Sequence, residues 1–446
     1  MSNLSPARIT ELLTKNETVF SEVALPGCIK SIECNQLASN CPIEDRLRVS
    51  SLFLPGDSEP TLILGVFDGH GGGTIADLVS KRLFSYIALS LLPEARNFQI
   101  SSPEQLKSML IDLHYTPKPR GDLDLDAKES KSLEIFRKTL PDRADIVSNL
   151  KASFISCDND LSNEIQECLN DNGSGKDMLR FYLGAVVSGC CALVMVVHRG
   201  AAYIASAGDC RAVLGIQDKN AQDTNSEISS KDKRSVVGTK FTALELNDEH
   251  NCDNINEIRR LAASHPKSEQ NTMIKHNRLL GHLMPFRAFG DFTYKWPAEL
   301  IRACGITKVF GPDVIPSHYN TPPYLIAEPD VREVKIGRVD DHESKFLVMA
   351  SDGLWEFFES SRDVIETIVD HNINACRDGS REEYDANCAT HILRSALRAN
   401  SSLDYGLNEE ELRKLYHIRL ESTLTLPQTI VRNFRDDISI IVLKLQ

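Results

Sequence analysis

Short apolar runs that border an acidic residue form the clearest pattern in the chain. Four runs share this arrangement: residues 62–67 before Asp68, residues 201–205 before Asp209, residues 346–350 before Asp352, and residues 438–442 after Asp436. Runs of this length and composition predict buried β-strands. We expect them to be neighbours in one sheet, the last antiparallel to the others, so that all four carboxylates lie on the same edge. Such a cluster of carboxylates requires cations.

Apolar residues at helical spacing predict helices around these strands. The strongest helix follows Gly71-Gly72-Gly73 and ends near Pro93, and a short one begins at Ser5-Pro6. Further helices are predicted over 147–169, around 255–263 and around 364–372, and the segment 374–428 is expected to be mostly helical. Two segments lack such a pattern: a charged, weakly patterned insertion over 94–150 and a polar loop over 217–238.

An uncharged stretch over residues 181–197 has nearly the length of a membrane span. Gly184 and Ser188-Gly189 interrupt it, so we interpret it as two adjacent segments of the core. The sequence therefore predicts that the chain is not an integral membrane protein.

Charge and cysteine content exclude several classes of protein. The chain has 63 acidic and 50 basic residues and a net charge of -13, which argues against a nucleic-acid partner. Its 12 cysteines are scattered without a C-x-x-C pair, so neither a zinc module nor a disulfide framework is predicted. No signal peptide is visible, and Glu11 and Glu17 argue against an intact mitochondrial presequence.

The segment from Asp68 to Gly73 has the densest concentration of chemically useful residues. Asp68 offers a hard oxygen ligand, the glycines permit close approach of the backbone to an ion, and His70 can transfer a proton. A glycine-rich turn before a helix can alternatively hold a nucleotide phosphate, but the Lys-Ser/Thr of a P-loop is missing.

Further acidic residues favour the metal interpretation: Glu44, Asp45, Asp209, Asp352, Glu356 and Asp436. Any one of them alone is more simply explained as a turn or capping residue, but their joint occurrence beside strands is not. An all-oxygen set favours Mg²⁺ or Mn²⁺ over zinc. Two such ions, roughly 3.5–4 Å apart, activate a water for attack on a phosphoryl group. Hydrolysis of a phosphoester is the predicted reaction.

Five motifs in order carry a resemblance to a known family. They are Val66-Phe67-Asp68-Gly69-His70-Gly71-Gly72, Ala207-Gly208-Asp209-Cys210-Arg211, Arg287-Ala288-Phe289-Gly290-Asp291, Asp352-Gly353-Leu354-Trp355-Glu356 and Arg435-Asp436-Asp437-Ile438-Ser439. They resemble the motifs of the metal-dependent type 2C Ser/Thr protein phosphatases. The resemblance implies an α+β fold with a central β-sandwich of two antiparallel sheets, flanked by α-helices, and a dinuclear metal site at one end.

The resemblance also implies roles for individual residues. Ligands of the two Mg²⁺ or Mn²⁺ ions are expected to be Asp68, the Gly69 carbonyl, Asp352 and Asp436, with Glu44 and Asp45 helping directly or through water. Asp209 and Glu356 match residues near a weaker third metal. Glu356 stands where many relatives have Asp, which leaves that third site open.

His70 resembles the general acid that protonates the leaving serine oxygen. Asn40 stands where many family members have an Arg that binds phosphate. We therefore expect phosphate binding near Asn40 to depend on the metals and on Arg46. Arg287 and Asp291 are expected to form a structural ion pair or to brace the metal shell.

Several further segments resemble the mitochondrial subgroup of this family that acts on the pyruvate dehydrogenase complex. These segments are residues 35–40, 42–46, 265–269, 278–281, 283–287 and 321–325. The subgroup implies phosphoserine on the pyruvate dehydrogenase α subunit as substrate and the mitochondrial matrix as location. It also implies docking to the lipoyl domain of dihydrolipoamide acetyltransferase. Ca²⁺ is a candidate ion for assisting this docking, and a regulatory subunit is a candidate second partner.

The length of 446 residues allows one large domain with insertions. We expect residues 1–30 to be an N-terminal docking segment and residues 31–446 a single type 2C catalytic domain, with insertions near 94–150, 217–238 and 374–428. Two alternatives remain open: a type 2C phosphatase for another phosphoprotein, and a catalytically inactive scaffold of the same fold. The intact Asp68, Asp352 and Asp436 count against the scaffold.

Overall fold

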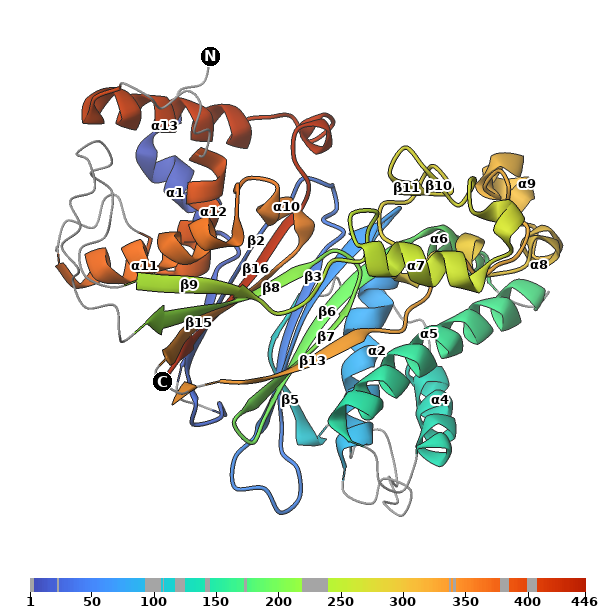
Figure 1. Ribbon diagram of the computed structural model, residues 1–446. Helices are drawn as coiled ribbons and strands as arrows, with labels where there is room; N and C mark the ends of the chain where they lie inside the picture. The colour runs from blue at the N-terminus through green and yellow to red at the C-terminus, as the bar shows by residue number, and fades with distance from the viewer. Residues whose placement is uncertain are drawn as a thin grey trace. The chain divides into compact units, whose positions relative to one another are not determined.

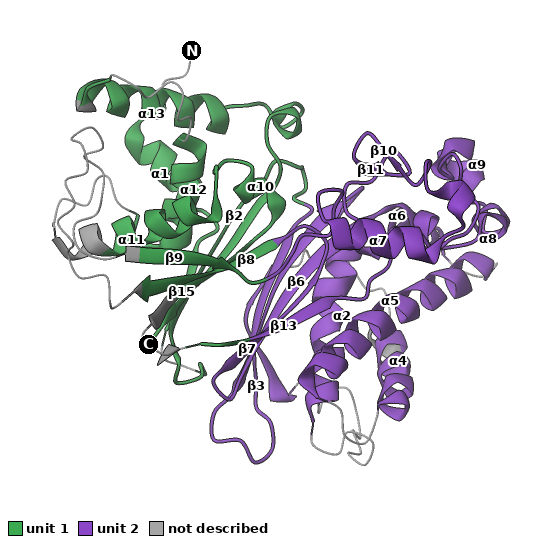
Figure 2. Cartoon of the chain, viewed as in Figure 1, with its two compact units in different colours: residues 1–43, 211–246, 334–446 green, residues 44–210, 247–333 purple. Residues whose placement is uncertain are grey.

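The structure is a computed structural model with two compact units (Figures 1 and 2). The residues that it describes are 4–21, 24–92, 106, 108–116, 125–140, 145–171, 175–218, 240–336, 338–339, 342–377, 385–398 and 407–446. Unit 1 consists of Met1–Ile43, Arg211–Leu246 and Val334–Gln446, and unit 2 of Glu44–Cys210 and Asn247–Glu333. Each unit is built around one β-sheet.

The sheet of unit 1 is antiparallel throughout. Its strands run in the order β1 (Thr18–Ser21), β2 (Ile29–Leu37), β16 (Ile438–Leu445), β15 (His342–Ala350), β8 (Arg211–Asp218) and β9 (Lys240–Glu245), and β14 (Arg338–Val339) pairs with β15. The N-terminal strands therefore lie beside the C-terminal strand.

Helices pack on one side of this sheet (Figure 1). They are α1 (Pro6–Thr14), α10 (Asp352–Trp355), α11 (Ser361–Arg377), α12 (Cys388–Arg398) and α13 (Glu409–Leu424), followed by the 3-10 turn η5 (Val431–Asn433). The predicted N-terminal helix is confirmed, because Pro6 occupies its first turn and the Ser5 hydroxyl accepts a hydrogen bond from the Arg8 N–H. Ile9 and Leu13 of α1 are buried in the core of unit 1.

The buried His391 of unit 1, which packs against a second buried histidine, makes the stability of the chain depend on pH. The rings of His371 and His391 lie 5.0 Å apart, and the His371 Nε2–H donates to the Asp385 carbonyl at 2.6 Å. Burial, and then the neighbouring His371, lowers the pKa of His391 to about 4. His391 is 6% exposed, so it is neutral in the folded chain at neutral pH.

We expect acidification to destabilise the chain through His391. The unfolded chain takes up a proton near the ordinary histidine pKa, whereas folded His391 does so only near its pKa of about 4. The resulting stability is complete above about pH 6.5 and is lost as the pH falls towards 4, by about 2 kcal/mol at pH 5. Urea denaturation at pH 7.5 and pH 5 measures this loss, and His391→Gln should remove that part of it. An unchanged loss in the variant would contradict the prediction.

The sheet of unit 2 has the strand order β13 (Asp330–Lys335), β7 (Ala201–Ala207), β6 (Gly189–His198), β4 (Thr61–His70), β3 (Arg46–Leu52) and β5 (Leu110–Tyr115), and β12 (Phe289–Gly290) pairs with β6. The pairs from β7 to β5 are antiparallel. Strands β4 and β6 lie in the middle, and all but the last residue of each is buried.

The helices of unit 2 are α2 (Thr74–Leu91), α4 (Leu125–Thr139), α5 (Ile146–Asn170), α6 (Lys176–Val187), α7 (Ile255–Ser264), α8 (Ala298–Ala303) and α9 (Ile306–Phe310). Short elements complete the unit: β10 (Ile274–Lys275), β11 (Arg278–Leu279), and the 3-10 turns η1 (Lys267–Glu269), η2 (Phe292–Tyr294) and η3 (Pro312–Val314). Helix α2 packs on β4 and β6 and against α5. Arg82 of α2 and Glu164 of α5 form a buried ion pair at 2.7 Å.

The structure confirms the predicted α+β class with two antiparallel sheets, but it corrects the expectation of one sheet. Asp68 lies in β4 and Asp209 follows β7, both in unit 2, whereas Asp352 and Asp436 border strands of unit 1. The pattern of an apolar run identifies a strand but contains no information on its partner strand. The four acids therefore divide into two pairs, one for each sheet.

Several predicted segments have clear outcomes. The uncharged stretch over 181–197 is the end of α6 followed by β6, as predicted. None of the helices within the described ranges has the length and apolar character needed to cross a membrane. The region 94–150 contains β5 and α4, which the sequence pattern did not reveal, and the start of α5, the helix predicted over 147–169. Most of the predicted loop at 217–238 lies outside the described residues.

Candidate functional site

Asp68, Gly69 and His70 are the last three residues of β4. They pair with Cys191, Cys190 and Gly189 of β6, which fixes their position in the middle of the sheet. Asp68 is only 9% exposed. Thr74 begins α2 four residues after His70, so the end of this central strand is also the start of the helix that covers it.

A second carboxylate of unit 2 lies close to Asp68. Asp209 stands between β7 and β8 and is 6% exposed, and one of its carboxylate oxygens lies within 4.8 Å of one from Asp68. Two negative charges at this distance with little solvent repel each other strongly. A hard divalent cation relieves the repulsion, so this pair fits Mg²⁺ or Mn²⁺.

His70 contacts Asp291, which the sequence analysis had paired with Arg287. The His70 Nε2 and the Asp291 Oδ2 lie 2.7 Å apart, and the Asp291 side chain is 5% exposed. A side chain on Gly189 would collide with both groups, so only glycine allows them to meet beside β6. Burial lowers the pKa of His70, but Asp291, with smaller contributions from Asp209 and Glu44, raises it to about 8.

Glu44 and Asp45 directly precede β3, and Arg46 is its first residue. Asp45 is 1% exposed, whereas Glu44 is half-buried. Arg46 is 2% exposed; its Nε lies 2.5 Å from the Asp77 Oδ1 in the first turn of α2, and its Nη1 donates to the Asp45 carbonyl at 2.7 Å. The Arg46 guanidinium is thus held by Asp45 and α2, and its role in phosphate binding stays a prediction.

In unit 1, three of the predicted metal residues lie near the ends of the neighbouring strands β15 and β16. Asp352 begins α10 one residue after β15, Glu356 caps the C-terminal end of that helix, and Asp436 precedes β16, which pairs with β15. One Asp436 oxygen accepts the Asp437 N–H at 2.7 Å, and the other lies 2.5 Å from the Arg432 Nη2. Burial raises the pKa of Asp436, and the charges of Asp437 and Glu356 add to the rise.

Asn40 is tethered to the same part of unit 1. Its backbone N–H donates to the Asp437 Oδ1 at 2.8 Å, and its side-chain amide donates to the Oδ2 at 3.1 Å. Arg435 donates to the Ser39 hydroxyl and to the Ala38 carbonyl. The position of Asn40 is therefore fixed by hydrogen bonds, and its role near phosphate stays a prediction.

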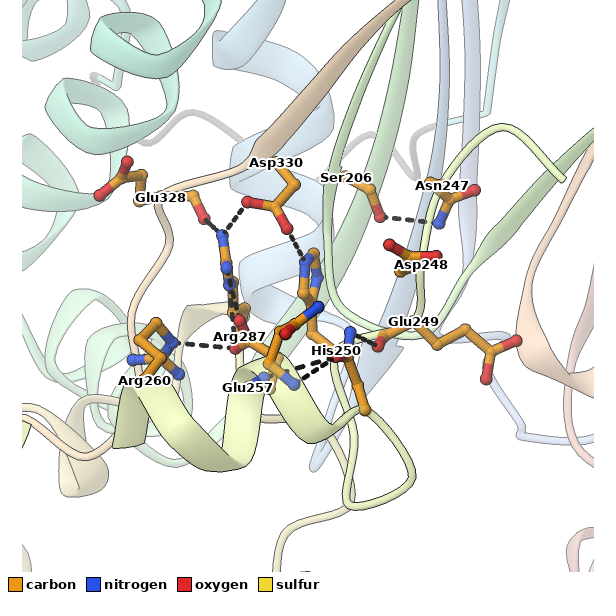
Figure 3. A network of polar contacts seen from close by, with 12 residues as sticks. Ser206, Asn247, Asp248, Glu249, His250, Glu257, Arg260, Arg287, Glu328 and Asp330 are labelled. Atoms are coloured by element: carbon orange, nitrogen blue, oxygen red, sulfur yellow. Dashed lines mark hydrogen bonds and ion pairs between the residues drawn. The ribbon is translucent and has the colours of Figure 1, made fainter. Parts of the chain in front are cut away.

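A buried polar network in unit 2 includes residues that sequence reasoning missed (Figure 3). Arg287 donates to both oxygens of Glu257, to the Asp330 Oδ1 at 2.9 Å and to the Glu328 carbonyl at 2.9 Å. The expected pair of Arg287 with Asp291 is therefore wrong, since Arg287 pairs with Glu257 and Asp330. These residues come from α7, the segment before β12, and β13, and no local spacing relates them.

Comparison with known proteins identifies the family. The model of the family Protein phosphatase 2C matches residues 138–403. The chain belongs to this family and is a metal-dependent protein phosphatase, as the motifs predicted.

Named relatives align over nearly the whole chain. It is 34% identical to the human mitochondrial [pyruvate dehydrogenase [acetyl-transferring]]-phosphatase 2, over 98% of this chain and 83% of that protein. It is 32% identical to the human mitochondrial phosphatase 1 of the same name, over 99% of this chain and 83% of that protein. The corresponding phosphatase 1 of Saccharomyces cerevisiae is 26% identical over 91% of this chain and 67% of its own length. The chain is thus homologous to the pyruvate dehydrogenase phosphatases.

Proposed function

We propose that this phosphatase removes phosphate from phosphoserine on the α subunit of pyruvate dehydrogenase and so reactivates the complex. The observation that carries this proposal is the 34% identity over 98% of the chain with a human phosphatase named for that substrate. The subgroup segments that surround the catalytic motifs support it, because they include the residues around Glu44, His265 and Thr321.

The proposed ligands for two Mg²⁺ or Mn²⁺ ions are Asp68, the Gly69 carbonyl, Asp352 and Asp436. Glu44 and Asp45 assist directly or through water, and Asp209 and Glu356 serve a weaker third ion. The support for this set is the oxygen chemistry of the side chains, the proximity of Asp68 to Asp209, and the raised pKa of the Asp436 carboxyl.

Bound ions supply an activated water and neutralise the charge of the phosphoryl group. The chain itself supplies the proton for the leaving group, because His70 is held protonated by Asp291 and its pKa of about 8 lies above neutral pH. Transfer of that proton to the serine oxygen completes the cleavage. Asp291 then keeps the His70 ring oriented for the next cycle.

We further propose that the enzyme works in the mitochondrial matrix, which extends the mitochondrial location in the names of its relatives. The proposed partners are the lipoyl domain of dihydrolipoamide acetyltransferase, with Ca²⁺ as an aid, and a regulatory subunit. Residues 1–30 are proposed as an N-terminal docking segment and residues 31–446 as a single catalytic domain.

A phosphate-release assay tests the substrate. We expect the full chain with Mg²⁺ to release phosphate from the phosphorylated pyruvate dehydrogenase complex at least about tenfold faster than from an unrelated phosphoserine protein, a preference of about 1.4 kcal/mol. Chelation of the metal should stop both reactions, because the carboxylates then have no cation between them.

Each alternative gives a different result. Equal release from both proteins would retain the phosphatase chemistry and assign the enzyme to another phosphoprotein. No release from either substrate, with or without added Mn²⁺, would favour the inactive scaffold and contradict the proposed function.

A further inference from the structure

The turn that contains Asp209 is hydrogen-bonded on both sides to the segment 247–250 of unit 2. The His250 N–H donates to the Gly208 carbonyl at 2.9 Å, and the Gly208 N–H donates to the His250 Nδ1 at 3.2 Å. On the other side of Asp209, the Asn247 side-chain amide donates to the Cys210 carbonyl at 2.9 Å. Both neighbours of Asp209 are therefore fixed by residues 247–250.

Without these hydrogen bonds, the turn would have considerable conformational freedom. Gly208 has φ of +130°, a conformation that side-chain-bearing residues rarely adopt, and a side chain there would collide with Cys191 of β6. The glycine solves the packing problem but leaves a flexible backbone directly before Asp209. The hydrogen bonds from Asn247 and His250 restrict that freedom.

The ring of His250 is itself locked. Because its Nδ1 accepts the Gly208 N–H, the proton of the neutral ring lies on Nε2, which donates to the Asp330 Oδ2 at 3.1 Å. His250 is fully buried, so no solvent competes for either nitrogen. The Asp330 contact thus fixes both the tautomer and the orientation that the contact with Gly208 requires.

The anchor behind His250 is an ion pair rather than a metal site. His250, Glu257 and Asp330 have ligand atoms within 4.8 Å of one another, as in a metal cluster. Arg287, however, donates to both carboxylates and supplies the positive charge that an ion would supply (Figure 3). Glu257 and Arg287 are 2% and 8% exposed, whereas Asp330 is 54% exposed, so the buried Arg287 holds the more exposed Asp330 carboxylate in place.

We propose that His250 and Asn247 are positioning residues for Asp209: through Gly208 and Cys210 they hold its carboxylate next to Asp68 for the weaker third ion. The proposal rests on the proposed role of Asp209. Neither residue is among the proposed metal ligands. Partners that orient a ligand typically change metal affinity by roughly 10–100-fold when they are removed.

Two substitutions of His250 separate the two hydrogen bonds of its ring. His250→Asn places an acceptor where Nδ1 stood and can keep the Gly208 contact, whereas His250→Gln places an amide near the position of Nε2 and keeps only the Asp330 contact. A titration of the full chain with Mn²⁺, monitored by the EPR signal of free Mn²⁺, measures the affinity of each class of Mn²⁺ site. This measurement does not depend on enzyme activity.

We expect His250→Gln to weaken the weakest class of Mn²⁺ by about tenfold or more and to leave the tighter ions within about twofold. His250→Asn should weaken that class by less than about threefold. Asn247→Ala, which removes the amide that holds Cys210, should weaken the same class and serves if His250→Gln does not fold. Asp209→Asn gives the size of the complete effect.

The control is His265→Gln, another buried histidine of unit 2, which bonds to Thr321 and stacks on Tyr324. It should leave every class of Mn²⁺ unchanged. Equal affinities for wild type, His250→Gln and Asn247→Ala would overturn the proposal, as would an equal loss in all classes or no loss in Asp209→Asn. A failed substrate preference in the phosphate-release assay would contradict the proposed function but leave these Mn²⁺ affinities interpretable.

Discussion

Asp68→Asn is expected to reduce phosphate release by at least about 1,000-fold, which corresponds to about 4 kcal/mol of transition-state stabilisation. The amide removes one negative charge from the end of β4, where the Asp68 and Asp209 carboxylates lie within 4.8 Å. Release from phosphorylated pyruvate dehydrogenase complex at saturating Mg²⁺ measures the loss. High Mg²⁺ should not restore the rate, because the change removes a proposed ligand of the tightly bound ions.

The fold should survive this substitution. Asp68 is 9% exposed and faces a like charge, so its neutralisation relieves repulsion in the metal-free chain rather than creating an unpaired charge. We expect the Tm of metal-free Asp68→Asn to equal or exceed that of wild type. Asp57→Asn is the control, since Asp57 pairs with the exposed Arg199 outside the site. Retained turnover in Asp68→Asn would refute the proposed metal ligands.

Local patterns predicted the parts of the structure that depend on local physics. The apolar runs beside Asp68 and Asp352 are strands, and the helix that follows the triple glycine is α2. Such elements follow from continuous apolar runs or from the helical spacing of apolar side chains, which neighbouring residues determine. The chemistry of the acidic set was also readable, because carboxylate oxygens favour the same class of ion in any arrangement.

The contacts between distant segments were not readable in this way. Asp291 lies 221 positions from His70, and its contact depends on the absence of a side chain at Gly189. The Arg46 side chain of β3 reaches Asp77 of α2, a contact that the sequence does not reveal. His250 lies in a polar segment without periodicity, yet it is fully buried. Pairings of this kind are decided by tertiary packing.

His70→Gln should separate two kinds of substrate. Serine leaves as a strongly basic alkoxide that needs a proton, whereas the nitrophenolate of 4-nitrophenyl phosphate leaves without one. We expect the variant to lose about 100-fold or more in kcat on the phosphoserine protein and less than about tenfold on 4-nitrophenyl phosphate. Both rates are measured at saturating Mg²⁺ with the same enzyme preparation.

Asp291→Asn tests the proposed proton donation by His70 through a change in the carboxylate that contacts its ring. Asn tolerates the left-handed conformation at this position, where φ is +48°, but it removes the charge that raises the pKa of His70. The loss should again be larger on phosphoserine than on 4-nitrophenyl phosphate, and smaller than that of His70→Gln. Equal losses on both substrates in both variants would mean that His70 supports the site without donating a proton. A selective loss in both would establish that His70 and Asp291 act together on the leaving group.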